Sequence, residues 1–241
     1  MPVLDDVLER VERVRSQGVL PIVVFDLDST LIETASRHLA ILREFVGAEW
    51  SHDPAVVAAV KSLSPADFRW HVGGPLRARG LDDPDLHRTL LAFWMERFFQ
   101  DDYLRHDTAA PGAVAYVKAV VERGGLAYYL TARPLPGMGL GTVASLVQLG
   151  FPYFDGRTVL QLKPSSDLDD AKYKKSAHET IASYGGEVVA TFENEPGHLN
   201  ALLADFPRAV HVRYGHVHSP SAPVPRPEIH HIETFYWGEG A

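Results

Sequence analysis

Two aspartates that follow an apolar run have the types and spacing needed for chemistry. Asp26 and Asp28 come directly after Ile22 to Phe25, and Ser29 and Thr30 are next along the chain. The apolar run is β-branched and aromatic throughout, which predicts a strand that is buried on both faces of a parallel sheet. Two carboxylates at its carboxyl end repel each other and lose hydration, so they favour a divalent cation or a substrate between them. The alternative is an ordinary turn after a strand with a polar end.

Two later strands also end in polar residues. Leu126 to Leu130 is followed by Thr131, and Val188 to Phe192 is followed by Glu193. The carboxyl ends of parallel strands lie at one edge of a sheet, where open α/β folds bind their ligands. We therefore expect these two side chains to lie beside Asp26, although the three positions are far apart in the sequence.

The rest of the chain must supply the sheet that positions these residues. Short buried strands alternate with amphipathic helices, which predicts an α/β fold with right-handed crossovers and helices on both faces of a parallel sheet. We expect a three-layer Rossmann-like core from residues 1–34 and 108–241, with an inserted all-helical domain at 35–107. The expected strands are Ile22–Phe25, Leu126–Leu130, Thr158–Leu162, Val188–Phe192 and Val210–Val212, and the expected core helices are Leu4–Val14, Val114–Val121, Gly141–Leu149, Ala171–Tyr184 and Leu199–Ala204.

Composition excludes several kinds of site and partner. The 241 residues include no cysteine, so disulfides, thiolate metal sites and a cysteine nucleophile are excluded. A net charge of -8 argues against nonspecific binding of nucleic acid. No apolar run approaches the roughly 20 residues that span a bilayer, and the charged amino terminus does not resemble a secretory signal. We expect a cytoplasmic protein with no membrane or nucleic-acid partner, either a monomer or a dimer.

Taken in order, four motifs resemble those of the haloacid dehalogenase-like hydrolase superfamily, most of whose members are magnesium-dependent phosphatases. The first is the D-x-D-x-T pattern at 26–30, and the second is a strand ending in Thr131. The third is a lysine at the start of a later helix, and the fourth is the acidic group at 193–195. The helical insert is similar in position to the helical caps of this family, which cover the active edge.

The resemblance implies a role for each of the first motifs. Asp26 would be the nucleophile that forms an aspartyl-phosphate, and Asp28 would be the general acid and then the general base. For both aspartates to converge, the chain must turn at Leu27. Thr131, with the neighbouring Ala132 and Arg133, would bind the phosphoryl group of a small phosphorylated substrate.

Thr30 belongs to the same group of expected phosphate-binding residues. From its place after the aspartates, we expect its hydroxyl to fix the loop by hydrogen bonding rather than to react. For Thr131, the alternative is that the hydroxyl only ends the strand. For Arg133, the alternative is an ordinary surface arginine.

The lysine of the third motif has four candidates. Lys174 is our prediction, because it opens a helix and follows a tyrosine, as in related sequences. Its ammonium would pair with Asp26 and offset charge on the transferring phosphoryl group. Lys163, Lys172 and Lys175 are the alternatives, with Lys175 the first of them.

The family implies Mg²⁺ as the cofactor. We expect Asp26, Asp28, Glu193 and Asn194 to hold it, although the family usually has aspartates where this chain has Glu193. Glu195 either orients such a ligand or ends the following helix. The predicted function is a magnesium-dependent phosphomonoester hydrolase. The alternatives are a phosphotransferase or dehalogenase of the same superfamily, or a noncatalytic protein that binds phosphate or metal.

Some aromatic and histidine residues are open to two interpretations. In the insert, several side chains could contact substrate but could equally form the insert's own core. The histidines near the end of the chain lack the helical pair of a zinc hydrolase, so we expect most to be surface or core residues. Two of them, His216 and His218, could instead line the entrance to the site. The residues concerned are Trp50, Phe68, Trp70, His71 and Arg77 in the insert, and His211, His216, His218, His230 and His231 near the end.

Overall fold

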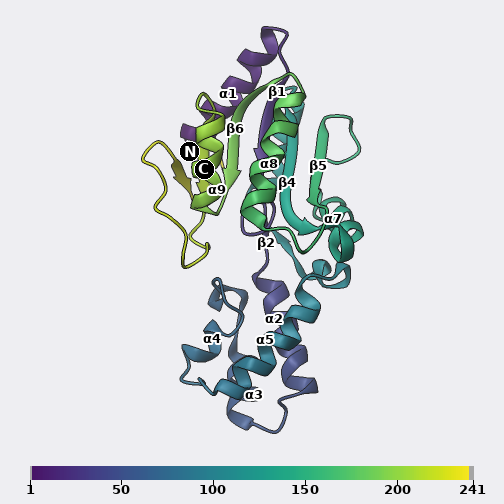
Figure 1. Cartoon of the computed structure of the whole chain (residues 1–241), viewed down its shortest axis with the longest axis vertical. Helices are drawn as coiled ribbons and strands as arrows, with labels where there is room; N and C mark the ends of the chain where they lie inside the picture. Colours follow the sequence, from purple (N-terminus) through teal and green to yellow (C-terminus); the bar gives the residue numbers. More distant parts are fainter. Residues whose placement is uncertain (1, 239–241) are drawn as a thin grey trace.

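A six-stranded, wholly parallel sheet is the centre of the larger of two lobes (Figure 1). The computed structural model describes residues 2–238. The strand order is β5-β4-β1-β6-β7-β8, so the aspartate-bearing β1 is an interior strand. The strands are β1 (Pro21–Phe25), β4 (Leu126–Pro134), β5 (Thr158–Lys163), β6 (Glu187–Glu193), β7 (Val210–Tyr214) and β8 (His230–Ile232).

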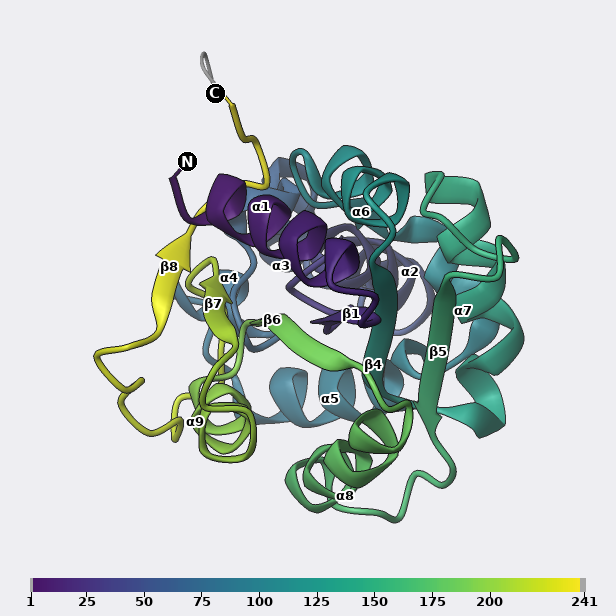
Figure 2. The ribbon, with the colours of Figure 1, turned by 90° about the horizontal axis from the view of Figure 1, so that it is seen from above.

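Side chains of β1 alternate between two apolar layers. Val23 and Phe25 pack with α1 and α6, whereas Ile22 and Val24 pack with α8 on the other face. Figure 2 shows α1 and α6 on one side of the sheet and α8 and α9 on the opposite side. The helices of this lobe are α1 (Pro2–Ser16), α6 (Ala113–Glu122), α7 (Leu135–Leu149), α8 (Asp170–Ser183) and α9 (Pro196–Asp205).

The smaller lobe is helical and lies at the carboxyl end of the sheet (Figure 1). Its apolar residues form a cluster separate from the two that cover the sheet. A short antiparallel pair, β2 (Ile32–Glu33) and β3 (Thr108–Ala109), joins the two points where the chain enters and leaves this lobe. Its helices are α2 (Ala35–Ala48), α3 (Pro54–Ser62), η1 (Pro65–Asp67), α4 (Gly74–Arg77), α5 (Pro84–Phe98) and η2 (Asp101–His106).

The predicted α/β class and helical insertion are confirmed. All five expected strands are present, and β8 adds a sixth strand near the end of the chain. Two details differ. β4 does not stop at Thr131 but continues to Pro134 through an irregular register, and the pair β2 and β3 was missed because two-residue strands carry no periodic signal. Within 2–238, no helix is long and apolar enough to cross a membrane.

His38 is the polar centre of the insert's aromatic cluster. Its ring stacks near Phe68, Trp94 and Phe98, with centroids 5.8, 5.6 and 4.8 Å away. The indole N–H of Trp94 donates to His38 Nδ1 at 3.0 Å. Burial, helped by the nearby Arg37 charge, lowers the pKa of His38 to about 3. The neutral imidazole is therefore the form that the folded insert holds.

This burial predicts an acid-dependent loss of stability. The pKa of His38 is lower in the folded protein than the ordinary value of 6.5, so its contribution is complete above that pH and is lost as the pH falls toward 3. Between pH 7 and pH 5, this residue alone should cost about 2 kcal/mol of unfolding free energy. His38→Gln, which keeps an acceptor for Trp94, should remove that part of the loss.

Urea unfolding of the wild type and His38→Gln at the two pH values measures the difference. His52→Gln, at an exposed position, is the matched control. An equal loss of stability in the wild type and His38→Gln would contradict the assignment.

Candidate active site

The turn after β1 places both aspartates at the carboxyl edge of the sheet. The backbone N–H of Asp26 donates to Phe192 of β6 at 2.9 Å, so Asp26 is still part of the sheet. The chain then reverses over Leu27 to Ile32, with two hydrogen bonds to Leu27 O. The sequence predicts a turn at Leu27, but the left-handed residue is Ser29, with φ 61°. This reversal, rather than strand geometry, brings Asp28 to the same side as Asp26.

Lys174 lies between two buried carboxylates. Its Nζ is 2.6 Å from Asp26 Oδ1 and 2.5 Å from Glu193 Oε2. The lysine comes from the first turns of α8, Asp26 follows β1, and Glu193 ends the adjacent β6. Three separate elements thus form one charge cluster.

The pKa values of Asp26 and Glu193 are shifted in opposite directions. Burial and the Glu193 charge raise the pKa of Asp26, although Lys174 opposes the shift. Burial also disfavours the charged form of Glu193, but the charges of Lys174 and His198 outweigh it and lower the pKa of Glu193. The pKa of Lys174 is raised because its two carboxylate partners outweigh its burial. The site therefore holds more negative charge than the lysine alone can satisfy.

Hydrogen bonds fix the orientation of the three residues after β6, Glu193 to Glu195. Glu193 Oε1 accepts the backbone N–H groups of Asn194 and Glu195 at 3.0 and 3.1 Å. Asn194 donates through Nδ2 to Val217 O at 2.7 Å, which turns its Oδ1 toward the buried Thr30 hydroxyl at 3.4 Å. Glu195 accepts from the backbone of Ser219. The loop after β7 therefore orients both residues.

Asp28 belongs to a second network, built with two arginines. Arg133 from β4 binds it with two N–H groups, at 2.6 Å to Oδ1 and 3.0 Å to Oδ2. Arg37 from α2 donates to Asp28 Oδ1 at 3.0 Å and binds Asp107 bidentately at 2.8 and 2.6 Å. Arg133 also reaches Asp107 at 2.9 Å. Two arginines and two aspartates thus alternate across the boundary between the lobes.

This network keeps Asp28 ionised. Burial would raise the pKa of Asp28, but the charges of Arg133 and Arg37 outweigh it and hold the pKa well below its ordinary value. Sequence reasoning missed Arg37 and Asp107. Their only signal is their position, since each lies within a few residues of the junction between core and insert.

Thr131 and Thr30 act on other site residues in this structure. Thr131 Oγ1 accepts the backbone N–H of Arg133 at 3.2 Å, and Thr131 lines the cavity together with Ala132. Thr30 donates to Asp26 Oδ2 at 2.9 Å and is fully buried behind it, outside the cavity lining. Its contact is with the carboxylate and not with the cavity.

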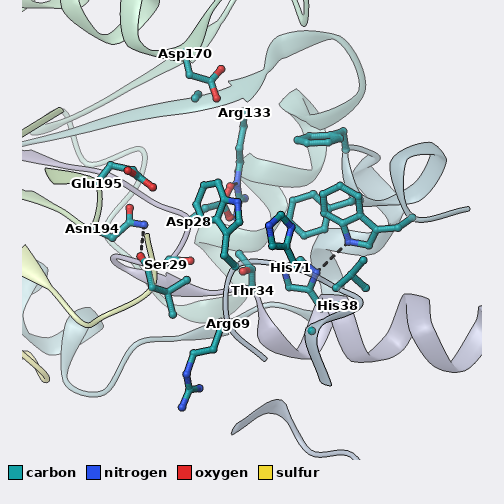
Figure 3. Close-up of a pocket in the computed structure, with 18 of the residues that line it drawn as sticks. Asp28, Ser29, Thr34, His38, Arg69, His71, Arg133, Asp170, Asn194 and Glu195 are labelled. Atoms are coloured by element: carbon teal, nitrogen blue, oxygen red, sulfur yellow. Dashed lines mark hydrogen bonds and ion pairs between the residues drawn. The ribbon is translucent and has the colours of Figure 1, made fainter. Parts of the chain in front are cut away.

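A cavity of about 690 Å³ lies between the carboxyl edge and the insert. Figure 3 shows Asp28 and Arg133 on one side of it and His38 and His71 on the other. Nine of the residues singled out in the core line it together: Asp26, Asp28, Thr131, Ala132, Arg133, Lys174, Glu193, Asn194 and Glu195. Of the residues singled out in the insert, Trp70, His71 and Arg77 also line it.

The structure separates the candidate lysines. Lys174 contacts Asp26, whereas Lys163 bonds Asp170 at 2.5 Å and Lys175 pairs with Asp205. Lys172 is exposed. Lys174 is thus the one of these four lysines that reaches the aspartate after β1.

The histidines near the end of the chain lie elsewhere. His216 and His231 both bond Glu233 on the surface, and His211 bonds Thr191 inside the core. Val217, between His216 and His218, lines the cavity in their place. His216 and His218 therefore do not line the entrance to the site.

The donor set beside Lys174 fits a hard divalent cation. Carboxylate oxygens of Asp26 and Glu193 contact the Lys174 ammonium, and the Asn194 amide oxygen lies 3.4 Å from the Thr30 hydroxyl that is bonded to Asp26. Oxygen ligands are those that Mg²⁺ prefers. Thr30 has one hydroxyl proton, which its shorter bond directs to Asp26, so the Asn194 oxygen keeps its capacity to accept. Asp28, the fourth predicted ligand, has both oxygens engaged by arginines.

Comparison with known proteins gives the fold its context. The sequence matches no protein-family model and no curated protein. The structure is similar to that of a proposed phosphatase from Clostridium difficile, with a TM-score of 0.52, 10% identity, and coverage of 83% of this chain and 86% of that one. A proposed haloacid dehalogenase-like hydrolase from Bacteroides fragilis gives a TM-score of 0.50, 10% identity, and coverage of 84% and 90%. This chain therefore shares the fold of these two structures.

Proposed function

We propose that the chain is a magnesium-dependent phosphomonoester hydrolase that works through an aspartyl-phosphate on Asp26. The observation that carries this proposal is the Lys174 ammonium placed between Asp26 and Glu193, at 2.6 and 2.5 Å, at the floor of the cavity. A carboxylate beside a fixed cation is suited to attack phosphorus, because the cation offsets the charge of the transferring group. The names of the two structural neighbours, a phosphatase and a hydrolase, agree with this class.

In the first half-reaction, a carboxylate oxygen of Asp26 attacks phosphorus and the bond to the leaving oxygen breaks. Lys174 and Arg133 are the cations placed to bind the phosphoryl oxygens, and Thr131 holds the backbone of Arg133. The leaving oxygen takes a proton from the general acid, Asp28. Because Asp28 is ionised among arginines here, it must first gain a proton, which the monoanion of the phosphomonoester supplies as its phosphate engages Arg133.

In the second half-reaction, water attacks the aspartyl-phosphate. Asp28, now a carboxylate again, accepts the proton of that water as general base. The bond from phosphorus to Asp26 breaks, and inorganic phosphate leaves. Thr30, bonded to Asp26 Oδ2, keeps the carboxylate in place through both steps.

Asp26, Glu193 and Asn194 would hold Mg²⁺ in this scheme, whereas Asp28, whose oxygens are bonded to Arg133 and Arg37, would keep the acid–base role. When bound, the ion supplies positive charge that stabilises the negative transition state. Glu193 stands where the family usually has aspartate, but its second oxygen is fixed by two backbone N–H groups, which limits the freedom of the longer side chain.

The nucleophile can be tested by phosphate release. With Mg²⁺ and a panel of phosphomonoesters, we expect turnover that EDTA removes. Asp26→Asn should reduce kcat by at least about a thousandfold, because an amide oxygen cannot form the intermediate. Asp102→Asn, at an exposed position, is the matched control and should keep wild-type turnover.

Full activity of Asp26→Asn would contradict the mechanism. Turnover that survives EDTA would contradict the need for a divalent cation. Tight Mg²⁺ binding without turnover on any ester would favour the phosphotransferase or noncatalytic alternatives.

Metal binding can be tested without turnover. Glu193→Gln removes one carboxylate charge from the predicted ligand set, so we expect Mg²⁺ affinity to fall at least about tenfold. Calorimetric titration of Mg²⁺ into each protein measures this. Glu179→Gln is the matched control, because Glu179 is exposed on α8 and does not line the cavity. Equal affinities for the wild type and Glu193→Gln would remove Glu193 from the site.

The buried arginine network predicts a large effect on stability. Asp107→Asn leaves Arg37 and Arg133 with a single carboxylate between them, and breaking buried ion pairs typically costs about 3–5 kcal/mol. We expect the unfolding free energy to fall by about 3 kcal/mol. Asp85→Asn, which breaks the exposed pair with Arg88, should cost much less. A similar cost for both variants would show that the network contributes little.

A further inference from the structure

The size of the cavity exceeds what a phosphoryl group needs. Its volume of about 690 Å³ is within the range of sites that bind drug-sized molecules. The reacting carboxylates occupy only the core side. The rest of the cavity is lined by the insert, so the part of the ligand beyond the phosphate would contact the insert.

The insert side is an aromatic wall, which we define as Trp70, Trp94, Phe98 and Phe99. Trp94 and Phe98 stack with centroids 4.4 Å apart, and Phe99 meets both edge-on at 5.7 and 5.1 Å. Trp70 and Phe99 remain 42% and 37% exposed although they line the cavity. Exposed aromatic surface inside a cavity is stabilised when a ligand covers it.

The aromatic wall begins directly beside the reacting groups. The Arg37 guanidinium lies 4.3 Å from the centre of the Phe98 ring and bonds Asp28 at 3.0 Å. One guanidinium group therefore separates the predicted general acid from the first aromatic ring. A ligand with its phosphate at Asp26 can reach the wall with the group attached to its leaving oxygen.

The insert's two cavity-lining arginines are engaged elsewhere. Arg69 donates to the carbonyl oxygens of Ala66 and Phe68, each at 3.0 Å, and Arg77 pairs with Asp82 at 3.1 Å. Arg77 is thus paired with a carboxylate, and Arg69 is held against its own loop, with its guanidinium directed away from Asp28 and Arg133 in Figure 3. The far end of the ligand is therefore better matched to apolar, flat chemistry than to a further phosphate or carboxylate.

Resting on the proposed hydrolase function, we propose that the substrate is a phosphomonoester whose alcohol carries a planar aromatic ring, which stacks against the aromatic wall. Stacking a flat ring on exposed tryptophan and phenylalanine combines apolar burial with favourable ring geometry. Both a nucleobase and a simple arene offer this chemistry, and the proposal covers their shared feature.

Two matched pairs of esters test the proposal. Adenosine 5′-monophosphate and ribose 5-phosphate both release the 5-hydroxyl of ribose, and 3-phenylpropyl phosphate and propyl phosphate both release a primary alkyl alcohol. We expect kcat/KM to be about tenfold higher for the aromatic member of at least one pair. An advantage in the first pair alone identifies a nucleobase, an advantage in the second alone identifies an arene, and both support ring stacking.

Variants of the aromatic wall test where the aromatic ring of the substrate binds. Trp70→Ala should reduce the aromatic preference, which is the ratio of kcat/KM values within a pair, at least about threefold. Trp70→Phe should retain most of that preference. Leu140→Ala removes an 82% exposed apolar side chain outside the cavity lining and should leave the preference unchanged. An unchanged preference in Trp70→Ala would overturn the assignment of the wall.

The proposal and the hydrolase function fail in different ways. Equal kcat/KM within both pairs would overturn the aromatic substrate and leave the hydrolase intact. If no ester is hydrolysed, the hydrolase fails, and calorimetric Kd values for the same four compounds then decide the ligand class. Tighter binding of an aromatic member supports the wall as its site, and equal binding overturns it.

Discussion

Charge compensation at the carboxyl edge of the sheet is the constraint on which the rest of the structure depends. Four carboxylates meet there with one lysine and two arginines, so the carboxylates outnumber these three cations by one, and His198 adds a contact of 3.4 Å to Glu193. Burying carboxylates without partners would cost more than a domain of this size can supply. The cations come from both lobes and from distant segments. The carboxylates are Asp26, Asp28, Asp107 and Glu193, and the cations are Arg37, Arg133 and Lys174.

The surplus charge explains why the two groups of carboxylates differ. Asp28 and Asp107 share two guanidinium groups, and each arginine binds one of them in a bidentate arrangement that suits planar partners. Asp26 and Glu193 share one ammonium, which is a point charge. The excess therefore falls on the lysine side, where oxygen donors face the cavity. That is the side on which a divalent cation would complete the balance.

Much of this arrangement could be predicted from the sequence. The apolar runs before Asp26 and Glu193 identify their strands, and parallel topology then brings their ends together. Lys174 could be preferred over its neighbours because it opens a helix after a tyrosine. These signals are local in the sequence, and the topology of the sheet converts them into positions in space.

Arg37 and Asp107 could not be predicted in the same way, because most charged residues near the end of a helical segment are solvated. Their burial depends on how the insert meets the core, which is a tertiary contact with no periodic pattern. The turn begins at Leu27, as predicted, but its left-handed residue, Ser29, could not be identified, because a left-handed serine has no strong sequence signature.

The pairing of β2 with β3 has a consequence for replacing the insert in an engineered chain. Ile32 lies opposite Ala109, so the chain enters and leaves the insert through two adjacent strands. A module joined in this way can be exchanged without disturbing the order of the sheet. Any replacement would, however, have to bring its own counterparts of Arg37 and Asp107. Replacement of the insert is thus restricted by Arg37 and Asp107, which lie near the junction with the core, rather than by the helices farther from it.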